Sequence, residues 1–152
     1  MIHLIHEMTY HLTAINTLST TEGSPHVTRH PWAIMEGSLE GPRIKARLEG
    51  HGSDWMRLGP DGYMRPDVRM QFRTSDGATL LLRVTGLIEQ TKAFQNAATS
   101  DLATSFADQY LRLSLEFEAG ASSYAWLNTS LFLAEGRLLG TGRMEFEVYR
   151  VA

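Results

Sequence analysis

The 152-residue chain contains no cysteine. This absence excludes disulfides, thiolate catalysis and zinc sites built on cysteine ligands. The chain also lacks a run of about 20 apolar residues, the length of a membrane helix, and its N-terminus lacks the pattern of a signal peptide. A formal net charge of −3 gives no basic excess for nucleic acid or an anionic membrane surface. We therefore expect a cytoplasmic protein that binds neither nucleic acid nor membrane.

Motifs for metal and cofactor chemistry are also missing from the sequence. The chain has no phosphate-binding glycine loop and no Gly-x-Ser-x-Gly elbow of a serine hydrolase. His6 and His11 stand one residue too far apart for the helical zinc-protease motif, in which the two histidines are four apart. We expect no cofactor and no bound metal.

Alternating apolar and polar residues are the strongest structural signal in the chain. A period of two is typical of a strand with two different faces, and it occurs over residues 4–12, 66–74, 110–118 and 143–149. Two Asp-Gly turns, Asp61-Gly62 and Asp76-Gly77, predict hairpin connections because these residues tolerate positive φ. Gly41-Pro42 marks another connection. Two further strands are expected over residues 80–84 and 124–134.

Residues 89–108 interrupt the strand pattern with a polar, alanine-rich segment. Leu102 and Phe106 are four residues apart, which favours a short helix over residues 100–108 with Ser100 as its N-cap. A loop without helix is the alternative interpretation of this segment. Either form can cover one end of a barrel.

These elements predict one all-β domain over residues 1–152, folded as a closed antiparallel β-barrel of the calycin or lipocalin kind. A barrel of about eight strands can enclose a small ligand. The pattern does not decide which face of the strands lines the interior. If the row with Asp67, Arg69 and Arg112 faces inward, the cavity is a polar pocket. If it faces outward, these charges form a solvated surface.

The run from Gly50 to Trp55 contains the first candidate site residue. Asp54 stands beside Trp55, and a carboxylate held near a large aromatic side chain can have a raised pKa suited to acid–base work. His51 is close enough in sequence to approach Asp54. The alternative interpretation is a hairpin in which Asp54 caps a turn and Trp55 packs in the core.

Further candidates stand on the predicted strands. Arg69 and Arg112 have forked donors that can bind a carboxylate or an enolate-like oxyanion, and Asp67 can orient Arg69 from the same strand face. Trp126 can stack on a flat ligand, like Trp55, and Asn128 can donate to a carbonyl. The alternatives are an ion-pair network that fixes strand register and, for Trp126, a place in the core.

An ordered series of short motifs runs from about Glu36 to Val151. The series comprises Gly37-Ser38-Leu39-Glu40-Gly41-Pro42-Arg43, Gly52-Ser53-Asp54-Trp55, Asp61-Gly62, Asp67-Val68-Arg69, Thr74-Ser75-Asp76-Gly77-Ala78, Tyr110-Leu111-Arg112, Phe117-Glu118, Tyr124-Ala125-Trp126-Leu127-Asn128 and Val148-Tyr149-Arg150-Val151. In order and spacing it resembles the domain of unknown function 3237, also called uncharacterised protein family 0311. The chain departs from the family pattern at Met70, Leu111 and Ala119, where Tyr, Phe and Thr are usual, and over residues 89–109.

The resemblance implies a β-barrel that is often an oligomer, here expected as a homodimer. Some family members occur among biosynthetic or catabolic enzymes, which implies a small-molecule ligand. Together with the candidate residues, this favours a cofactor-independent acid–base enzyme: an isomerase, a lyase that adds or eliminates water, or a cyclase. The alternative is a non-catalytic barrel that binds or carries a hydrophobic small molecule.

Overall fold

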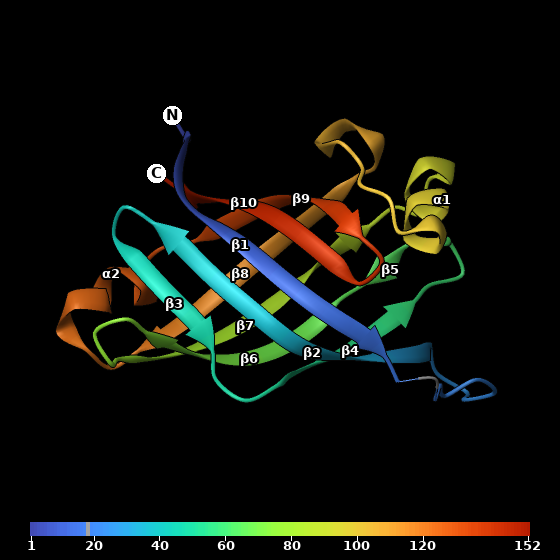
Figure 1. Cartoon of the computed structure of the whole chain (residues 1–152), viewed down its shortest axis with the longest axis horizontal. Coiled ribbons are helices and arrows are strands. Elements are labelled where there is room, and N and C mark those ends of the chain that lie inside the picture. The colour runs from blue at the N-terminus through green and yellow to red at the C-terminus, as the bar shows by residue number, and fades with distance from the viewer. Residues whose placement is uncertain (18) are drawn as a thin grey trace.

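The computed structural model describes residues 1–17 and 19–152. Within these residues, strands dominate and helices are short (Figure 1). The strands are β1 (Leu4–Asn16), β2 (Thr28–Gly41), β3 (Ile44–Leu48), β4 (Gly52–Leu58), β5 (Met64–Arg65), β6 (Asp67–Thr74), β7 (Thr79–Ile88), β8 (Leu111–Ala119), β9 (Phe132–Gly140) and β10 (Arg143–Val151). The α-helices are α1 (Lys92–Ser100) and α2 (Ala125–Asn128), and two 3₁₀ turns cover Phe106–Asp108 and Ser122–Tyr124.

All strand pairings are antiparallel and together they form a ring. β1 pairs with β10 on one side and with β2 on the other. The ring continues from β10 through β9, β8 and β7 to β6, and β6 pairs with β3 and β4, which both pair with β2. The two chain ends lie side by side (Figure 1), because His3 and Ala152 exchange backbone hydrogen bonds of 3.0 and 2.9 Å. The predicted all-β antiparallel class is confirmed.

Strand alternation decides which side chains face the interior of the ring. Along β8, Leu111, Leu113, Leu115 and Phe117 are buried, while the residues between them are half-buried or exposed. β6 behaves in the same way, with its apolar row inward. The charged row that contains Asp67, Arg69 and Arg112 therefore lies on the outer face, which was the alternative that the sequence left open.

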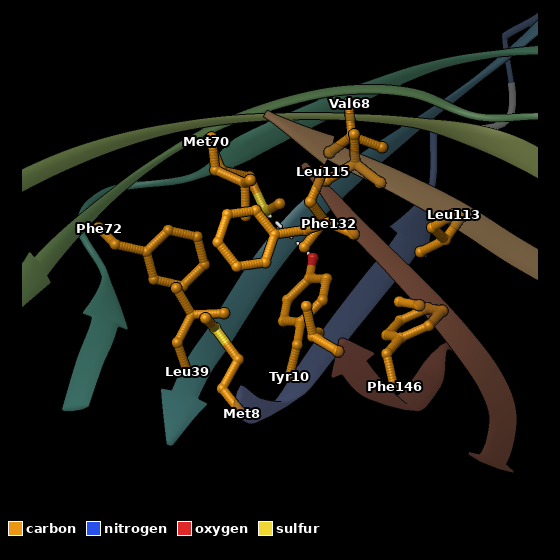
Figure 2. Packing of buried hydrophobic residues seen from close by; sticks show 14 of the residues in the cluster. Met8, Tyr10, Leu39, Val68, Met70, Phe72, Leu113, Leu115, Phe132 and Phe146 are labelled. Carbon is orange, nitrogen blue, oxygen red and sulfur yellow. Dashed lines mark hydrogen bonds between the residues drawn. The ribbon is translucent and has the colours of Figure 1, made fainter. Parts of the chain in front are cut away.

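Aromatic rings fill much of the interior (Figure 2). Tyr10 stacks on Phe146 with ring centroids 5.1 Å apart, and Phe117 meets Phe132 edge to face at 5.2 Å. Phe146 pairs across the sheet with Gly136, where an added Cβ would lie 2.4 Å from the phenyl ring. The absence of a side chain at Gly136 therefore leaves the space that the Phe146 ring occupies.

Both predicted Asp-Gly turns are confirmed. Gly62 has φ of +80° and Gly77 has φ of +90°, a backbone region that glycine enters without steric cost. Gly77 connects β6 to β7, and Gly62 lies between β4 and β5. The connection at Gly41-Pro42 is confirmed as the turn between β2 and β3.

The predicted helix over residues 100–108 is wrong, because α1 lies one segment earlier. Its N-cap is Thr91, whose hydroxyl accepts a hydrogen bond from the Phe94 amide, and Ser100 is its last residue. The helix stops where Asp101 adopts a left-handed conformation with φ of +54°. Phe94 and Ala97 are its buried residues, whereas Leu102 is exposed. The helix is therefore anchored by Phe94 and Ala97 and not by Leu102 and Phe106, on which the prediction was based. Among the described residues, no helix is long and apolar enough to cross a membrane.

The strand expected over residues 124–134 begins only at Phe132. Before it, the chain forms the short helix α2 at the opposite end of the ring from α1 (Figure 1). The Asn128 side chain explains the turn, because it bonds both the N–H and the carbonyl of Ala119 at 2.8 Å. These bonds fold the chain back onto the end of β8.

Replacing Thr91 tests the position of the helix. Thr91→Ala removes the cap on Phe94 and the 2.7 Å bond that the hydroxyl donates to the Asp108 carbonyl. We expect a loss of about 1–2 kcal/mol in the free energy of unfolding, measured by urea denaturation. Ser100→Ala is the matched control and should change this free energy by less than about 0.5 kcal/mol. Equal effects of the two substitutions would contradict the assignment of the cap.

Candidate functional site

A cavity of about 230 Å³ lies inside the ring at the end covered by α1. Its wall comes mainly from apolar side chains of the strands, and Phe94 and Ala98 of α1 contribute to it. Four aromatic residues line it, namely Tyr10, Trp32, Phe94 and Phe146. Its other polar contributors are Asp54, Gln90 and Thr141. The cavity is therefore largely apolar, and Asp54 is the single carboxylate among its described lining residues.

Asp54 is the acidic group of this cavity. It lies on β4, and strand alternation places it on the inner face together with Gly52 and Met56. Asp54 is 7% exposed. The backbone N–H of Asp67, on β6, donates a 3.0 Å hydrogen bond to its Oδ1. Burial raises the pKa of Asp54, the Asp67 amide lowers it in part, and the Asp67 charge raises it again, which places the pKa at about 6. Asp54 is therefore able to exchange protons near neutral pH.

Tyr10 is the second titratable group of the cavity, and the sequence reasoning did not select it. Its hydroxyl donates to the Met70 sulfur at 3.3 Å, as the dashed line in Figure 2 shows. Burial raises the pKa of Tyr10 far above its usual value, and the negative charge of Asp54 adds to this effect. Tyr10 is thus a protonated donor at every physiological pH. Met70, one of the departures from the family pattern, supplies a weak acceptor.

The indole beside Asp54 is Trp32, not Trp55. Trp32 pairs directly with Asp54 across β2 and β4, so the two side chains share the inner face. Trp55 follows Asp54 in the chain and therefore points to the opposite face, where it is 62% exposed. The expected pairing of a carboxylate with an aromatic side chain occurs, but through a cross-strand neighbour.

Arg69, Arg112 and Asp67 do not line the cavity that contains Asp54. Arg69 is exposed on the outer face of β6. The Arg112 guanidinium lies 3.7 Å from the Glu135 carboxylate and above the Tyr110 ring. The Asp67 carboxylate lies 3.8 Å from the guanidinium of Arg29, which stands on β2.

The other three candidates also lie apart from Asp54. His51 is exposed and lines an open groove on the outer face together with Arg69. Trp126 is on α2, at the far end of the ring, where the Arg43 guanidinium covers its ring at 3.6 Å. Asn128 closes the turn after β8, as described above. Of the eight predicted residues, Asp54 alone has its side chain in the cavity wall.

An ion cluster around the buried Glu7 side chain, at the far end of the ring, was not expected from the sequence. Glu7 is 5% exposed because the register shifts between His6 and Met8, which turns Glu7 away from the outer row. Arg43 and Arg150 each donate to its Oε1 at 2.8 Å. Burial alone would raise the pKa of Glu7, but the two guanidinium groups outweigh it and hold the pKa below its usual value. The cluster ties β1 to β10 and to the turn between β2 and β3.

Of the two residues that the sequence reasoning missed, Tyr10 could have been found from strand alternation and Trp32 could not. The alternating row of residues 4–12 places Tyr10 with Met8 and Leu12, which both face inward in the structure. Trp32 lies in a stretch without clear alternation, and only its register with Asp54 shows its place. Among the residues that the structure describes, no group of three or more His, Asp or Glu side chains is arranged to hold a metal ion.

An antiparallel ring of strands around a mainly apolar cavity defines the class of barrel-like proteins with an interior pocket. Within that class the chain belongs to the DUF3237 family, described as proteins of unknown function, whose model matches residues 2–151. The resemblance noted in the sequence is thereby confirmed. No curated protein matches the chain at a significant level.

Solved structures share this fold over the whole chain. A conserved protein of unknown function from Rhodopseudomonas palustris matches with a TM-score of 0.88 at 18% identity, covering 100% of this chain and 99% of its own. A beta-barrel like protein from Acinetobacter baumannii matches at 0.79 and 23% identity, covering 100% and 97%. An enzyme from Penicillium herquei matches at 0.64 and 17% identity, covering 100% and 94%. At these identities the likeness establishes the fold alone.

The raised pKa of Asp54 predicts that its charge opposes folding. The folded pKa of about 6 exceeds the unfolded value of about 3.9, so stability falls as pH rises between these values. Asp54→Asn keeps an oxygen that can accept the Asp67 bond and removes the charge. We expect the variant to unfold with a free energy up to about 3 kcal/mol larger at pH 8, and with no such gain below about pH 4. Urea denaturation across this pH range measures both.

Glu7→Gln is the control of opposite sign. The pKa of Glu7 is lowered in the folded protein, so its charge stabilises the fold above the unfolded pKa and loses this effect in acid. Glu7→Gln should therefore lower the free energy of unfolding at pH 8. A loss of stability at pH 8 from both substitutions would contradict the raised pKa of Asp54.

Proposed function

We propose that this protein is a cofactor-independent acid–base enzyme that acts on a small organic molecule inside a closed, calycin-like barrel. The reaction is an isomerisation, the addition or elimination of water, or an intramolecular ring closure. The observation that carries the proposal is the placement of Asp54, a buried carboxylate with a pKa of about 6 in an otherwise apolar cavity wall. Each of these reactions requires only a group that accepts and returns a proton.

Asp54 acts as the base in this proposal. With a pKa of about 6 it is mostly ionised at neutral pH, and it takes a proton from a carbon or hydroxyl of the substrate. The same carboxyl group then returns the proton at a second position, so no external acid is consumed. A base with its pKa near the working pH contributes about 10²–10⁴-fold to the rate. The Asp67 amide holds Oδ1 and leaves Oδ2 for the substrate.

Tyr10 stabilises the charge that this proton transfer creates. Its hydroxyl stays protonated and can donate to a substrate oxygen as that oxygen becomes negative. The bond to Met70 does not prevent this, because a thioether is a weak acceptor that a carbonyl oxygen can replace. Arg69 and Arg112 have no part in this step, since both lie outside the cavity.

The neighbouring structures add a limited argument. The protein from Penicillium herquei, which shares the fold, is titled an enzyme. This supports catalysis on the fold by analogy alone, because one fold hosts many functions. The proposal therefore rests on Asp54 and Tyr10 in the cavity wall.

Non-catalytic binding is the second candidate function. It is favoured by the number of apolar side chains in the cavity wall, such as Ile34, Val68, Leu113 and Leu138. Apolar walls with a few polar groups are typical of ligand pockets in general. In this case Asp54 orients the ligand and no product forms.

Incubation of the protein with a small-molecule extract, followed by untargeted mass spectrometry, distinguishes the two functions. The wild type should convert a metabolite into an isomer or into a product that differs by one water. Asp54→Asn should lose this conversion by about 10²-fold or more while still binding the compound. Tyr10→Phe should reduce it less severely, because only one hydrogen bond to the transition state is lost.

Glu116→Gln is the control, since Glu116 is an exposed carboxylate on the outer face of β8. It should convert the metabolite like the wild type. Equal conversion by Asp54→Asn and the wild type would remove Asp54 from the mechanism. Co-purification of one unchanged compound with both proteins would favour the binding function.

A further inference from the structure

We propose that the cavity selects an uncharged, mainly apolar molecule of about one ring that carries a carbonyl or hydroxyl group, and that it rejects carboxylates and phosphates. This inference rests on the proposed function and names its substrate class. It follows from the charge, the size and the polar groups of the cavity.

The charge of the wall excludes anions. Among the described lining residues there is no lysine, arginine or histidine, and Asp54 supplies a negative charge. An anion would lose its hydration without gaining a cationic partner, and it would face a like charge in a medium of low dielectric. Neither the predicted arginines nor those of the Glu7 cluster can compensate, since Arg69 and Arg112 are on the outer face and Arg43 and Arg150 bind Glu7 at the other end.

The size of the cavity limits the ligand. A volume of about 230 Å³ is just below the range of roughly 300–1,000 Å³ that is typical of drug-sized ligands. The aromatic rings of Trp32, Phe94 and Phe146 give flat apolar surfaces around this space. A compact ring or a short branched chain therefore suits it better than a nucleotide, a sugar phosphate or a long lipid.

The polar groups specify one oxygen function. Tyr10 offers a donor and Asp54 an acceptor, on β1 and β4, which lie on either side of β2. They are close enough for the charge of Asp54 to act on Tyr10. A carbonyl oxygen can accept from Tyr10 while a neighbouring acidic C–H or O–H meets Asp54. A protonated amine would instead pair with Asp54 and occupy the base, so the productive ligand is neutral.

Methionine methyl groups provide the test, because three of the seven methionines line the cavity. These are Met56, Met64 and Met144, whereas Met35 lines a groove on the outer face with Glu36 and Arg47 and serves as the internal control. The full chain is labelled with ¹³C-methyl methionine and titrated with cyclohexanone, cyclohexanecarboxylate and cyclohexylamine. The three probes share a ring and differ in charge.

The proposal expects cyclohexanone to shift the Met56 and Met64 signals, with no shift of Met35. The carboxylate should bind at least about tenfold more weakly than cyclohexanone, which is 1.4 kcal/mol, whereas the amine should bind through its pair with Asp54 and lose this binding in Asp54→Asn. In Asp54→Asn, the discrimination against the carboxylate should shrink by about the same factor, because the like charge is gone. Tighter or equal binding of the carboxylate in the wild type, or unchanged binding of the amine in Asp54→Asn, overturns the proposed selectivity.

The outcomes separate this inference from the proposed function. If the carboxylate binds best, the cavity remains a ligand site and only its substrate class is wrong. If none of the probes shifts the cavity methionines at millimolar concentration, both the substrate class and the cavity as a site are overturned. The binding titration does not depend on turnover, so a loss of catalysis cannot mimic either result.

Discussion

Closure of the sheet is the constraint on which the rest of the structure depends. β1 pairs with β10 and with β2, so the first strand joins the two sides of the sheet and leaves no free edge there. Once the ring is formed, each strand has one inner and one outer face, and every second residue is turned inward. The same rule that buries Phe72 and Leu115 also buries Asp54, and it leaves Arg69 and Arg112 in solvent.

The two ends of the ring each contain a buried carboxylate, and the pKa of the two is shifted in opposite directions. At the α2 end, Glu7 is neutralised by Arg43 and Arg150, and its pKa is lowered. At the α1 end, Asp54 has a backbone amide and, among the described lining residues, no cationic partner, and its pKa is raised to about 6. Pairing offsets the desolvation cost of a buried charge, whereas an unpaired buried charge keeps that cost and has a shifted pKa that suits proton transfer. This contrast within one chain is why the site is assigned to the α1 end.

Features set by neighbouring residues in the sequence were predicted correctly, whereas features set by contacts between distant segments were not. Alternation gave the strand rows of β6, β8 and β10, and the Asp-Gly turns gave two connections. The helix α1 was placed too late in the sequence, and the segment of α2 was expected to be a strand. The reason is that α1 depends on the burial of Phe94 and Ala97 and α2 on the bonds of Asn128 to Ala119, contacts between segments that local pattern does not relate. Asp54 was selected for its neighbour Trp55, and the residue that actually accompanies it is Trp32 on another strand.

The sequence by itself determined the all-β class, the family, the turns and the choice of Asp54 as a candidate residue, because these depend on short-range patterns of side chains and glycine. Only the tertiary structure decided which row faces inward, that Tyr10 and Trp32 accompany Asp54, and that the arginines do not. The physical reason is that a period of two is symmetric between the faces of an isolated strand. When the strands form a ring, the more apolar row of each strand is buried, and this removes the symmetry between the two faces. The cavity exists only because strands far apart in sequence surround the same interior.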